Sequence, residues 1–177
     1  MAAESYNSVS KWFHWVTVGL MAVALPVGFV IGHIKDSDKM AFYAIHESAG
    51  LTILLVAVAR LVWRLAHPPP PLPEHIPAPM RLAARVNHWL LYVALIAQPV
   101  LGFVATNAWG FPLQDQTAYL GFIDLPKVME KNVPLAEAVQ AAHNVLGVSI
   151  AALLVLHVGA AIFHQAIRRD GTLLRIV

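Results

Sequence analysis

The chain has 177 residues, of which 58% are hydrophobic and 12% charged, and its mean hydropathy is +0.63. Soluble domains carry about 25% charged residues, so this composition excludes an ordinary soluble domain. The formal net charge of +2, without a basic cluster interleaved with aromatic residues, argues against a nucleic-acid partner. Because the chain has no cysteine, disulfides, iron–sulfur ligation and covalently attached haem are excluded, and histidine is the strongest metal ligand left.

Four apolar stretches are long enough to cross a bilayer as helices, which need about 20 residues each. They cover residues 12–34, 45–65, 82–105 and 135–167. We therefore predict one all-α domain over residues 1–177, an integral membrane four-helix bundle surrounded by lipid. Eight basic residues lie on the side of the termini and four on the other side, so the positive-inside rule places both termini in the cytoplasm.

The first two spans carry one histidine each, at opposite ends. His14 lies about one turn inside the cytoplasmic boundary of the first span, whereas His46 opens the second span near the outer surface. The second span closes with Arg60 and Arg64 at the inner surface. We expect these arginines either to hold the acidic groups of a cofactor or a quinone, or only to anchor the helix among lipid headgroups.

Residues 67–79 contain seven of the twelve prolines, which predicts an extended strap across the cytoplasmic face. The third span then carries a single histidine, His88, at the same cytoplasmic depth as His14. Its side chain is expected either to line a site at that depth or to bond to a neighbouring carbonyl. A long outer loop, residues 106–134, leads to the fourth span.

The fourth span organises the chain because three histidines share one of its faces. At about 100° per residue, the steps from His143 to His157 and from His157 to His164 each return the side chain to nearly the same direction. The rise from His143 to His157 is roughly 21 Å, most of the hydrocarbon thickness. Imidazoles in lipid are costly, so they are functional candidates by default, with hydrogen bonding to neighbouring helices as the alternative.

Depth pairs the histidines of different spans, His14 with His157 near the cytoplasm and His46 with His143 near the outer surface. A planar macrocycle between two helices needs one axial nitrogen from each, so we expect two stacked metal centres with these four ligands. Iron with two histidine ligands transfers electrons rather than binding oxygen.

Two glycines support the same interpretation. Gly50 and Gly147 each follow a histidine of the outer pair by four residues. A glycine one turn beyond a ligand leaves room for a flat macrocycle lying along the helix, and ordinary small-residue packing between membrane helices is the alternative.

Several motifs, taken in their order and spacing, resemble the bacterial cytochrome b561 family. These are four-helix membrane proteins with two b-type haems, which include the superoxide oxidase type and are related to the cytochrome b subunits of membrane hydrogenases. The resemblance covers nearly the whole chain. The motifs are WFHW at 12–15, IHESAG at 45–50, RLVWR at 60–64, HWLLY at 88–92, HNVLG at 143–147, LH at 156–157 and DGTLLR at 170–175. It implies two non-covalent haem b groups on the four paired histidines, and a multi-pass protein of the bacterial inner membrane.

The resemblance also implies an oxidoreductase of the superoxide:ubiquinone type. In that type the outer haem takes electrons from superoxide and the inner end reduces ubiquinone. In this chain His164 lies one face-repeat below His157, near the cytoplasmic boundary, and there we expect a quinone carbonyl to accept a hydrogen bond from it. The outer loops depart from this picture, because seven acidic residues against four lysines leave the outer face at a formal charge of −3, whereas positive potential steers an anion.

Two alternatives therefore stay open. Besides the superoxide:ubiquinone oxidoreductase, the chain could be a haem b electron-transfer subunit of a dehydrogenase or hydrogenase complex, with a redox protein partner, or a non-redox histidine-lined transporter of metal ions or protons. A transporter predicts acidic residues inside the spans, and the sequence has none between their interfacial ends.

Overall fold

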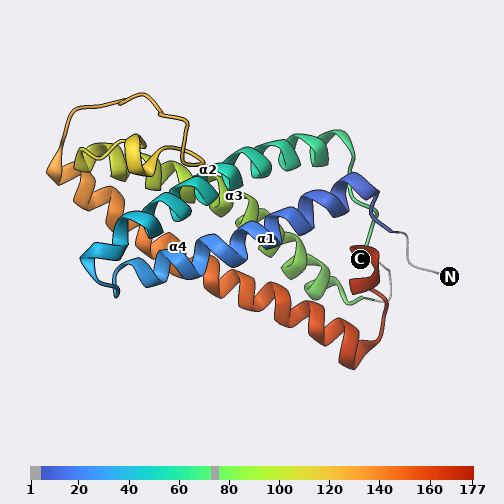
Figure 1. Cartoon of the computed structure of the whole chain (residues 1–177). Coiled ribbons are helices and arrows are strands. Elements are labelled where there is room, and N and C mark those ends of the chain that lie inside the picture. The colour runs from blue at the N-terminus through green and yellow to red at the C-terminus, as the bar shows by residue number, and fades with distance from the viewer. Residues whose placement is uncertain (1–4, 73–75) are drawn as a thin grey trace.

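The computed structural model describes residues 5–72 and 76–177 as a bundle of four long helices joined by loops and short helical turns (Figure 1). The long helices are α1 (Ser8–Ile31), α2 (Asp36–Ala66), α3 (Ala78–Trp109) and α4 (Val133–Phe163). The short turns are the 3-10 helix η1 (Asp115–Thr117), the π-helix η2 (His164–Arg168) and the 3-10 helix η3 (Leu173–Arg175).

Each long helix is apolar and long enough to cross a membrane, α4 being taken together with the π-helical turn that follows it. The prediction of an all-α bundle with four membrane-capable helices is confirmed for the described residues. The ends of the helices differ from the predicted spans. α1 stops at Ile31 because the chain turns at Gly32, and α2 already begins at Asp36, where Asp36 and Asp38 place negative charge at its N-terminus, as the helix dipole favours.

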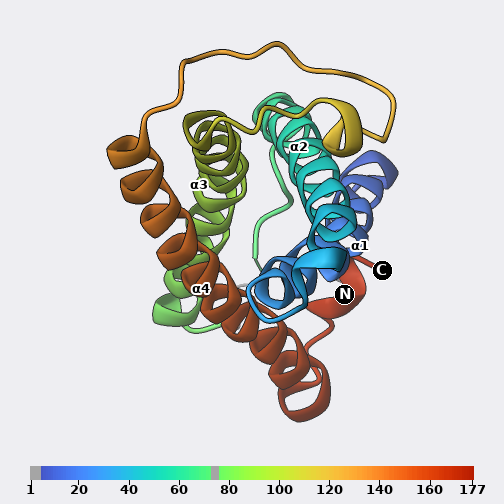
Figure 2. The same ribbon diagram turned by 60° about the vertical axis from the view of Figure 1, so that its left-hand side comes forward.

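The helices pack in the order α1, α2, α3, α4, with α1 against α2 and α3 against α4 (Figure 2). The central cluster is small and consists of Ala24, Ile53, Ala57 and Leu95. Many large apolar side chains face outward instead, such as Val155, which is 72% exposed. An apolar exterior around a small core is what a bilayer requires, because lipid tails are as apolar as the side chains.

The start of α1, the C-terminal residues and residues 67–72 of the proline-rich segment lie at one end of the bundle (Figure 1). The Tyr6 amide donates to the carbonyl of Arg175 at 3.0 Å, and the Arg175 guanidinium donates to the carbonyls of Pro70 and Pro71 at 2.8 and 2.9 Å. The predicted proline strap begins here, although its residues 73–75 lie outside the described residues. Two α-helical hairpins therefore bring the termini to the same side of the bundle.

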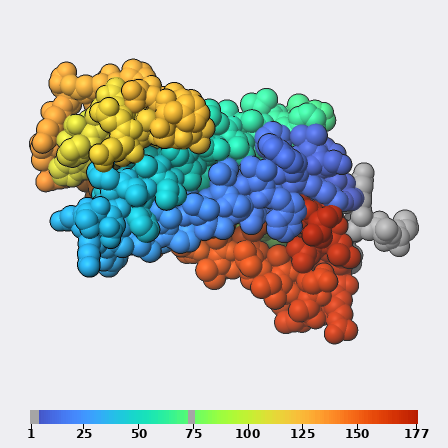
Figure 3. Space-filling model, in the orientation of Figure 1, coloured from blue at the N-terminus to red at the C-terminus, as the bar shows by residue number. Residues whose placement is uncertain are grey.

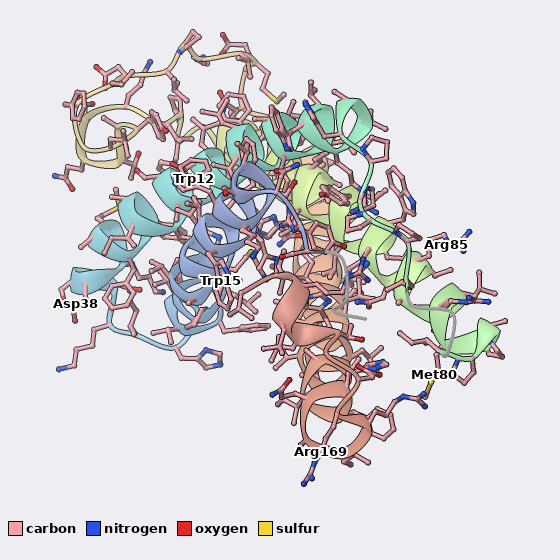
Figure 4. All side chains as sticks on the ribbon, turned by 90° about the vertical axis from the view of Figure 1, so that its right-hand side faces the viewer. Trp12, Trp15, Asp38, Met80, Arg85 and Arg169 are labelled. Atoms are coloured by element: carbon pink, nitrogen blue, oxygen red, sulfur yellow. The ribbon has the colours of Figure 1, made fainter. Side chains whose placement is uncertain are left out.

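Basic side chains surround this end. Figure 4 views it directly, with Arg85 and Arg169 pointing away from the bundle. Trp12 and Trp15 lie on the outer side of α1, where they are 57% and 47% exposed. Arginine and tryptophan at the end of membrane helices are typical of the boundary between headgroups and acyl chains.

Candidate functional site

The structure brings His46 on α2 and His143 on α4 together in the half of the bundle away from the termini. Their ring centres lie 6.1 Å apart, with the planes at 80°. A metal bound by two imidazoles at about 2 Å from each nitrogen sets the ring centres roughly 6 Å apart. The pair therefore has the separation of two axial ligands on one metal.

Backbone carbonyls orient both rings. His46 Nδ1 lies 2.9 Å from the carbonyl oxygen of Ala24 on α1, and His143 Nδ1 lies 3.1 Å from that of Gln98 on α3. A carbonyl only accepts, so each Nδ1 carries the proton and donates it. Each Nε2 is left unprotonated, which is the form that binds a metal.

Two further glycines make this arrangement possible. A Cβ on Gly28 would lie 2.6 Å from Cε1 of His46, and one on Gly102 would lie 3.0 Å from Cε1 of His143. Each glycine is four residues beyond the residue whose carbonyl holds the same histidine, one turn along the same helix. Close approach of the imidazole thus requires glycine at both positions.

A cavity of about 670 Å³ adjoins the outer pair and is lined by residues of all four helices. Gly50 lines it with open space beside its Cα, because a Cβ added there would meet nothing within 4 Å, whereas a Cβ on Gly147 would lie 3.2 Å from the Gln98 amide nitrogen. Two buried oxygens of lining residues, Glu47 Oε2 and Gln98 Oε1, have no hydrogen-bond partner among the described residues. The volume suits a large cofactor, and the residues present fit a haem held by the two histidines.

Glu47 lines the cavity, whereas from the sequence alone it counts among the acidic residues of the outer face. Its position in the chain assigns it to the acidic outer surface, whereas the structure places it inside the bundle, where its Oε1 accepts a hydrogen bond from Thr106 at 2.9 Å. An acidic side chain next to His46 therefore lines the cavity and adds less to the charge of the outer face.

The second histidine group lies toward the end that carries the termini. His14 on α1 and His157 on α4 have ring centres 6.2 Å apart, again the separation of two axial ligands. The ring of His88 on α3 stands edge-on to that of His157, with the ring centres 5.2 Å apart. Of the two expectations for His88, lining a site at this depth is therefore the one that fits. The prediction that His88 shares the depth of His14 agrees with this contact.

Arg60 distinguishes this group from the outer pair. Its guanidinium donates to Nδ1 of His14 at 3.2 Å, so that nitrogen accepts and the ring proton belongs on Nε2. Arg60 must therefore leave His14 before Nε2 of this ring can bind a metal. Both Arg60 and Arg64 stack over the ring of Tyr92, at 5.4 and 5.5 Å, and within the described chain neither forms a salt bridge with a carboxylate. They are half-buried cations available to an acidic group.

His164 lies apart from both groups, at the first residue of the π-helical turn η2. Its Nδ1 donates to Asp170 Oδ2 at 2.5 Å, and both side chains are well covered, at 13% and 4% exposed. Arg168 Nε and the Thr172 amide donate to the same carboxylate at 3.2 and 3.1 Å. Among the described residues, the hydrogen bond of the His164 ring is made by Nδ1, so Nε2 is the nitrogen that could meet a ligand.

Two pairs of histidines therefore lie at opposite depths of a bundle whose four helices are long and apolar enough to cross a membrane. Residues 5–177 match the prokaryotic cytochrome b561 family. The chain belongs to this family. It is therefore a multi-pass haem b protein of the bacterial inner membrane that takes part in electron transport.

Three relatives cover nearly the whole chain. Cytochrome b561 homolog 2 of Escherichia coli is 31% identical over 177 residues, which cover 98% of this chain and 92% of the relative. The probable superoxide oxidase CybB of Yersinia pestis is 28% identical, over 98% of this chain and 96% of the relative. Cytochrome b561 homolog 1 of Escherichia coli is 25% identical, over 97% of this chain and 96% of the relative.

Sequence reasoning missed Gly28 and Gly102, and with them the carbonyls that hold the outer histidines. A signal was present, because each of these glycines follows a proline inside its helix, Pro26 in α1 and Pro99 in α3. A proline and a glycine within one turn loosen a helix and let another group approach its backbone.

Proposed function

We propose that this cytochrome carries electrons across the membrane through two b-type haems. His46 and His143 would hold one, and His14 and His157 the other. The supporting observation is that both pairs have nearly the same ring separation, 6.1 and 6.2 Å, at two depths of one bundle. Along α4, His143 and His157 are about 21 Å apart, a distance that matches the thickness of most of the hydrocarbon layer.

The chain's own residues would position and insulate the cofactors. The carbonyls of Ala24 and Gln98 fix the outer imidazoles, and Gly50 leaves open space on the cavity side of α2, whereas the Gln98 amide fills the space beside Gly147. Arg60 and Arg64 would turn toward the acidic groups of the inner haem, which frees His14. A haem held by two histidines would supply one-electron transfer rather than oxygen binding.

A quinone is the proposed partner at the end with the termini. His164 lies about 10 Å beyond His157 along the same helix, close to the boundary of the membrane. Because Asp170 engages Nδ1, Nε2 is the ring nitrogen of His164 that would form the hydrogen bond with a quinone carbonyl. Reduction of ubiquinone to the quinol consumes two electrons and two protons, and His164 would pass protons from the aqueous side.

Superoxide is the proposed electron donor at the other end. Two superoxide ions would give two molecules of oxygen and the two electrons that one quinone needs. The relative from Yersinia pestis, named a probable superoxide oxidase, supports this direction. The surface supports it less, because two outer lysines are already paired, Lys39 with Asp36 at 2.7 Å and Lys127 with Glu130 at 2.6 Å. This pairing is the observation that favours the alternative, a haem b subunit that exchanges electrons with a dehydrogenase or another redox protein.

The test is to purify the full chain, count haem per chain and add superoxide together with a soluble ubiquinone analogue. We expect two haems, all extracted by acid–acetone because no cysteine is present for attachment, and formation of quinol by the chain alone. A count near one would contradict the pairing. Haems that dithionite reduces but superoxide does not would contradict the donor and favour the subunit function.

A further inference from the structure

The loop between α3 and α4 contains a short apolar hairpin, residues 117–123, which we call the loop tip. Its sequence TAYLGFI carries no charge, and aspartates 115 and 124 flank it. Tyr119 and Ile123 form an antiparallel bridge, with N–O distances of 2.8 and 3.0 Å. The loop covers the side of α2 at the end of the bundle opposite the termini (Figure 3).

The outward side of the loop tip is strongly apolar. Phe122 is 76% exposed and Leu120 is 52% exposed. Leu120 also has a positive φ of 57°, a conformation that glycine, asparagine or aspartate usually supplies in a turn exposed to water. A leucine there, beside a nearly bare phenylalanine, indicates an environment that is not water.

The depth of the loop tip follows from its contacts with α2. The Leu120 amide donates to Ser48 Oγ at 3.0 Å, and the Tyr119 hydroxyl lies 3.2 Å from Thr52 Oγ1. Ser48 and Thr52 lie about 3 and 9 Å further along α2 than His46, toward the middle of the bundle. The loop tip thus reaches the level of His46 or beyond.

The polar and apolar residues of α4 indicate at which depth of the bundle the apolar zone begins. Asn144, which is exposed, accepts a hydrogen bond from Gln140 at 2.9 Å, and from residue 145 to Phe163 the helix has no Asp, Glu, Lys or Arg. Asn144 is next to His143, whose ring faces that of His46. The apolar zone therefore begins at the level of His46, and the loop tip lies at that boundary.

The backbone amides of the loop tip are paired, as lipid requires of hydrogen-bond donors. Unpaired amides are costly where water is scarce. All seven amides from residue 117 to residue 123 have an acceptor: the carbonyls of residues 114, 115, 118, 119 and 123, and the Ser48 hydroxyl. A loop in water has no need of such complete pairing.

We propose that the loop tip is inserted into the membrane leaflet at this end, at the boundary between headgroups and acyl chains, and that lipid covers Leu120 and Phe122. This inference does not depend on the electron donor or the quinone. It assigns the loop a second task, because the turn of α2 that it contacts also carries His46 and Gly50 on the cavity side. Lipid contact at the loop tip would thereby hold this turn of α2, which lines the cavity, in position.

The absence of cysteine makes the test direct, because a single cysteine introduced for labelling is unique. Phe122→Cys and Leu120→Cys are each labelled with a nitroxide in the haem-loaded full chain, reconstituted into phosphatidylcholine nanodiscs. Glu130→Cys is the matched control, since this residue belongs to the same loop and its side chain is 90% exposed. Collision rates with oxygen, which concentrates in lipid, and with a water-soluble nickel chelate are then compared.

We expect the two loop-tip labels to collide with oxygen severalfold more often than with the nickel chelate, and the Glu130 label to show the reverse. Nickel access at Phe122 equal to that at Glu130 would place the loop tip in water and overturn the proposal. Low access to both reagents would mean that a second copy or another protein covers it, which would also overturn it. An unchanged haem spectrum in each variant verifies that the bundle is intact.

Discussion

Gly28 and Gly102 stand where any side chain would strike a histidine of the outer pair. In Gly28→Ala the new Cβ would lie 2.6 Å from His46, so the imidazole must move away from the carbonyl of Ala24. We expect loss of about half of the bound haem and destabilisation of roughly 1–3 kcal/mol, as for other overpacked sites. Haem content is measured against Gly19→Ala, a change in the same helix with nothing within 4 Å. Full haem content in Gly28→Ala would refute the role assigned to this contact.

The four paired histidines allow a second test at the same scale. His46→Ala and His143→Ala should remove the same spectral component, and His14→Ala and His157→Ala should remove the other, because each haem loses one axial ligand. Redox difference spectra of the four variants provide the measurement. His88→Ala is the comparison, because the His88 ring also contacts His157 but is not a proposed ligand. Both spectral components should remain in this variant. If His46→Ala and His157→Ala lost the same component, the pairing would be wrong.

Among the elements, the segment after α4 is the one whose shape depends on a single carboxylate. The π-helical turn η2 and a left-handed residue, Arg169, bring Asp170 back onto His164. Burial alone would raise the pKa of Asp170, but hydrogen bonds from Thr172 and His164 outweigh it and hold the pKa below its ordinary value. Above the ordinary pKa of about 4 this carboxylate therefore stabilises the segment, and the stabilisation is lost as the pH falls further.

We accordingly expect the amides of residues 170–175 to exchange faster as the pH is lowered below about 4, beyond the intrinsic pH dependence of exchange. Hydrogen exchange with mass spectrometry on the reconstituted protein measures this. In Asp170→Asn these amides should exchange faster than in the wild type at neutral pH, and their exchange should increase less when the pH is lowered. Equal protection of the two proteins at neutral pH would show that the carboxylate does not hold the segment.

The helices and the spacing of their histidines were predictable because both follow from patterns within one span. Apolar length indicated the four helices, and steps of fourteen and seven residues placed His143, His157 and His164 on one face. The contacts of Gly28 with His46 and of Arg60 with His14 were not predictable, because they depend on the register between α1 and α2. No periodicity within a single helix specifies that register.

At the scale of the whole molecule, the bundle has two unlike ends. One end joins the termini and the proline-rich segment through Arg175 and carries His164 with its carboxylate. The other end has the cavity, paired surface charges and the apolar loop tip. An electron path between such ends has a direction, and the direction can be tested with one variant that leaves the four proposed ligands in place.

His164→Ala should separate reduction of the haems from reduction of quinone. If electrons enter at the cavity end and leave beside His164, superoxide will still reduce both haems of the variant, but quinol will form at least about a hundredfold more slowly, the usual scale for loss of a general acid. Both signals are followed in one stopped-flow experiment with a soluble ubiquinone analogue. His67→Ala, an exposed histidine at the same end of the bundle, is the matched control and should behave as the wild type. Haems that stay reduced while quinol fails to appear would support an exit at His164. Undiminished quinol formation would place the quinone elsewhere on the bundle, whereas haems that superoxide cannot reduce even in the wild type would make a partner dehydrogenase the better assignment for the donor.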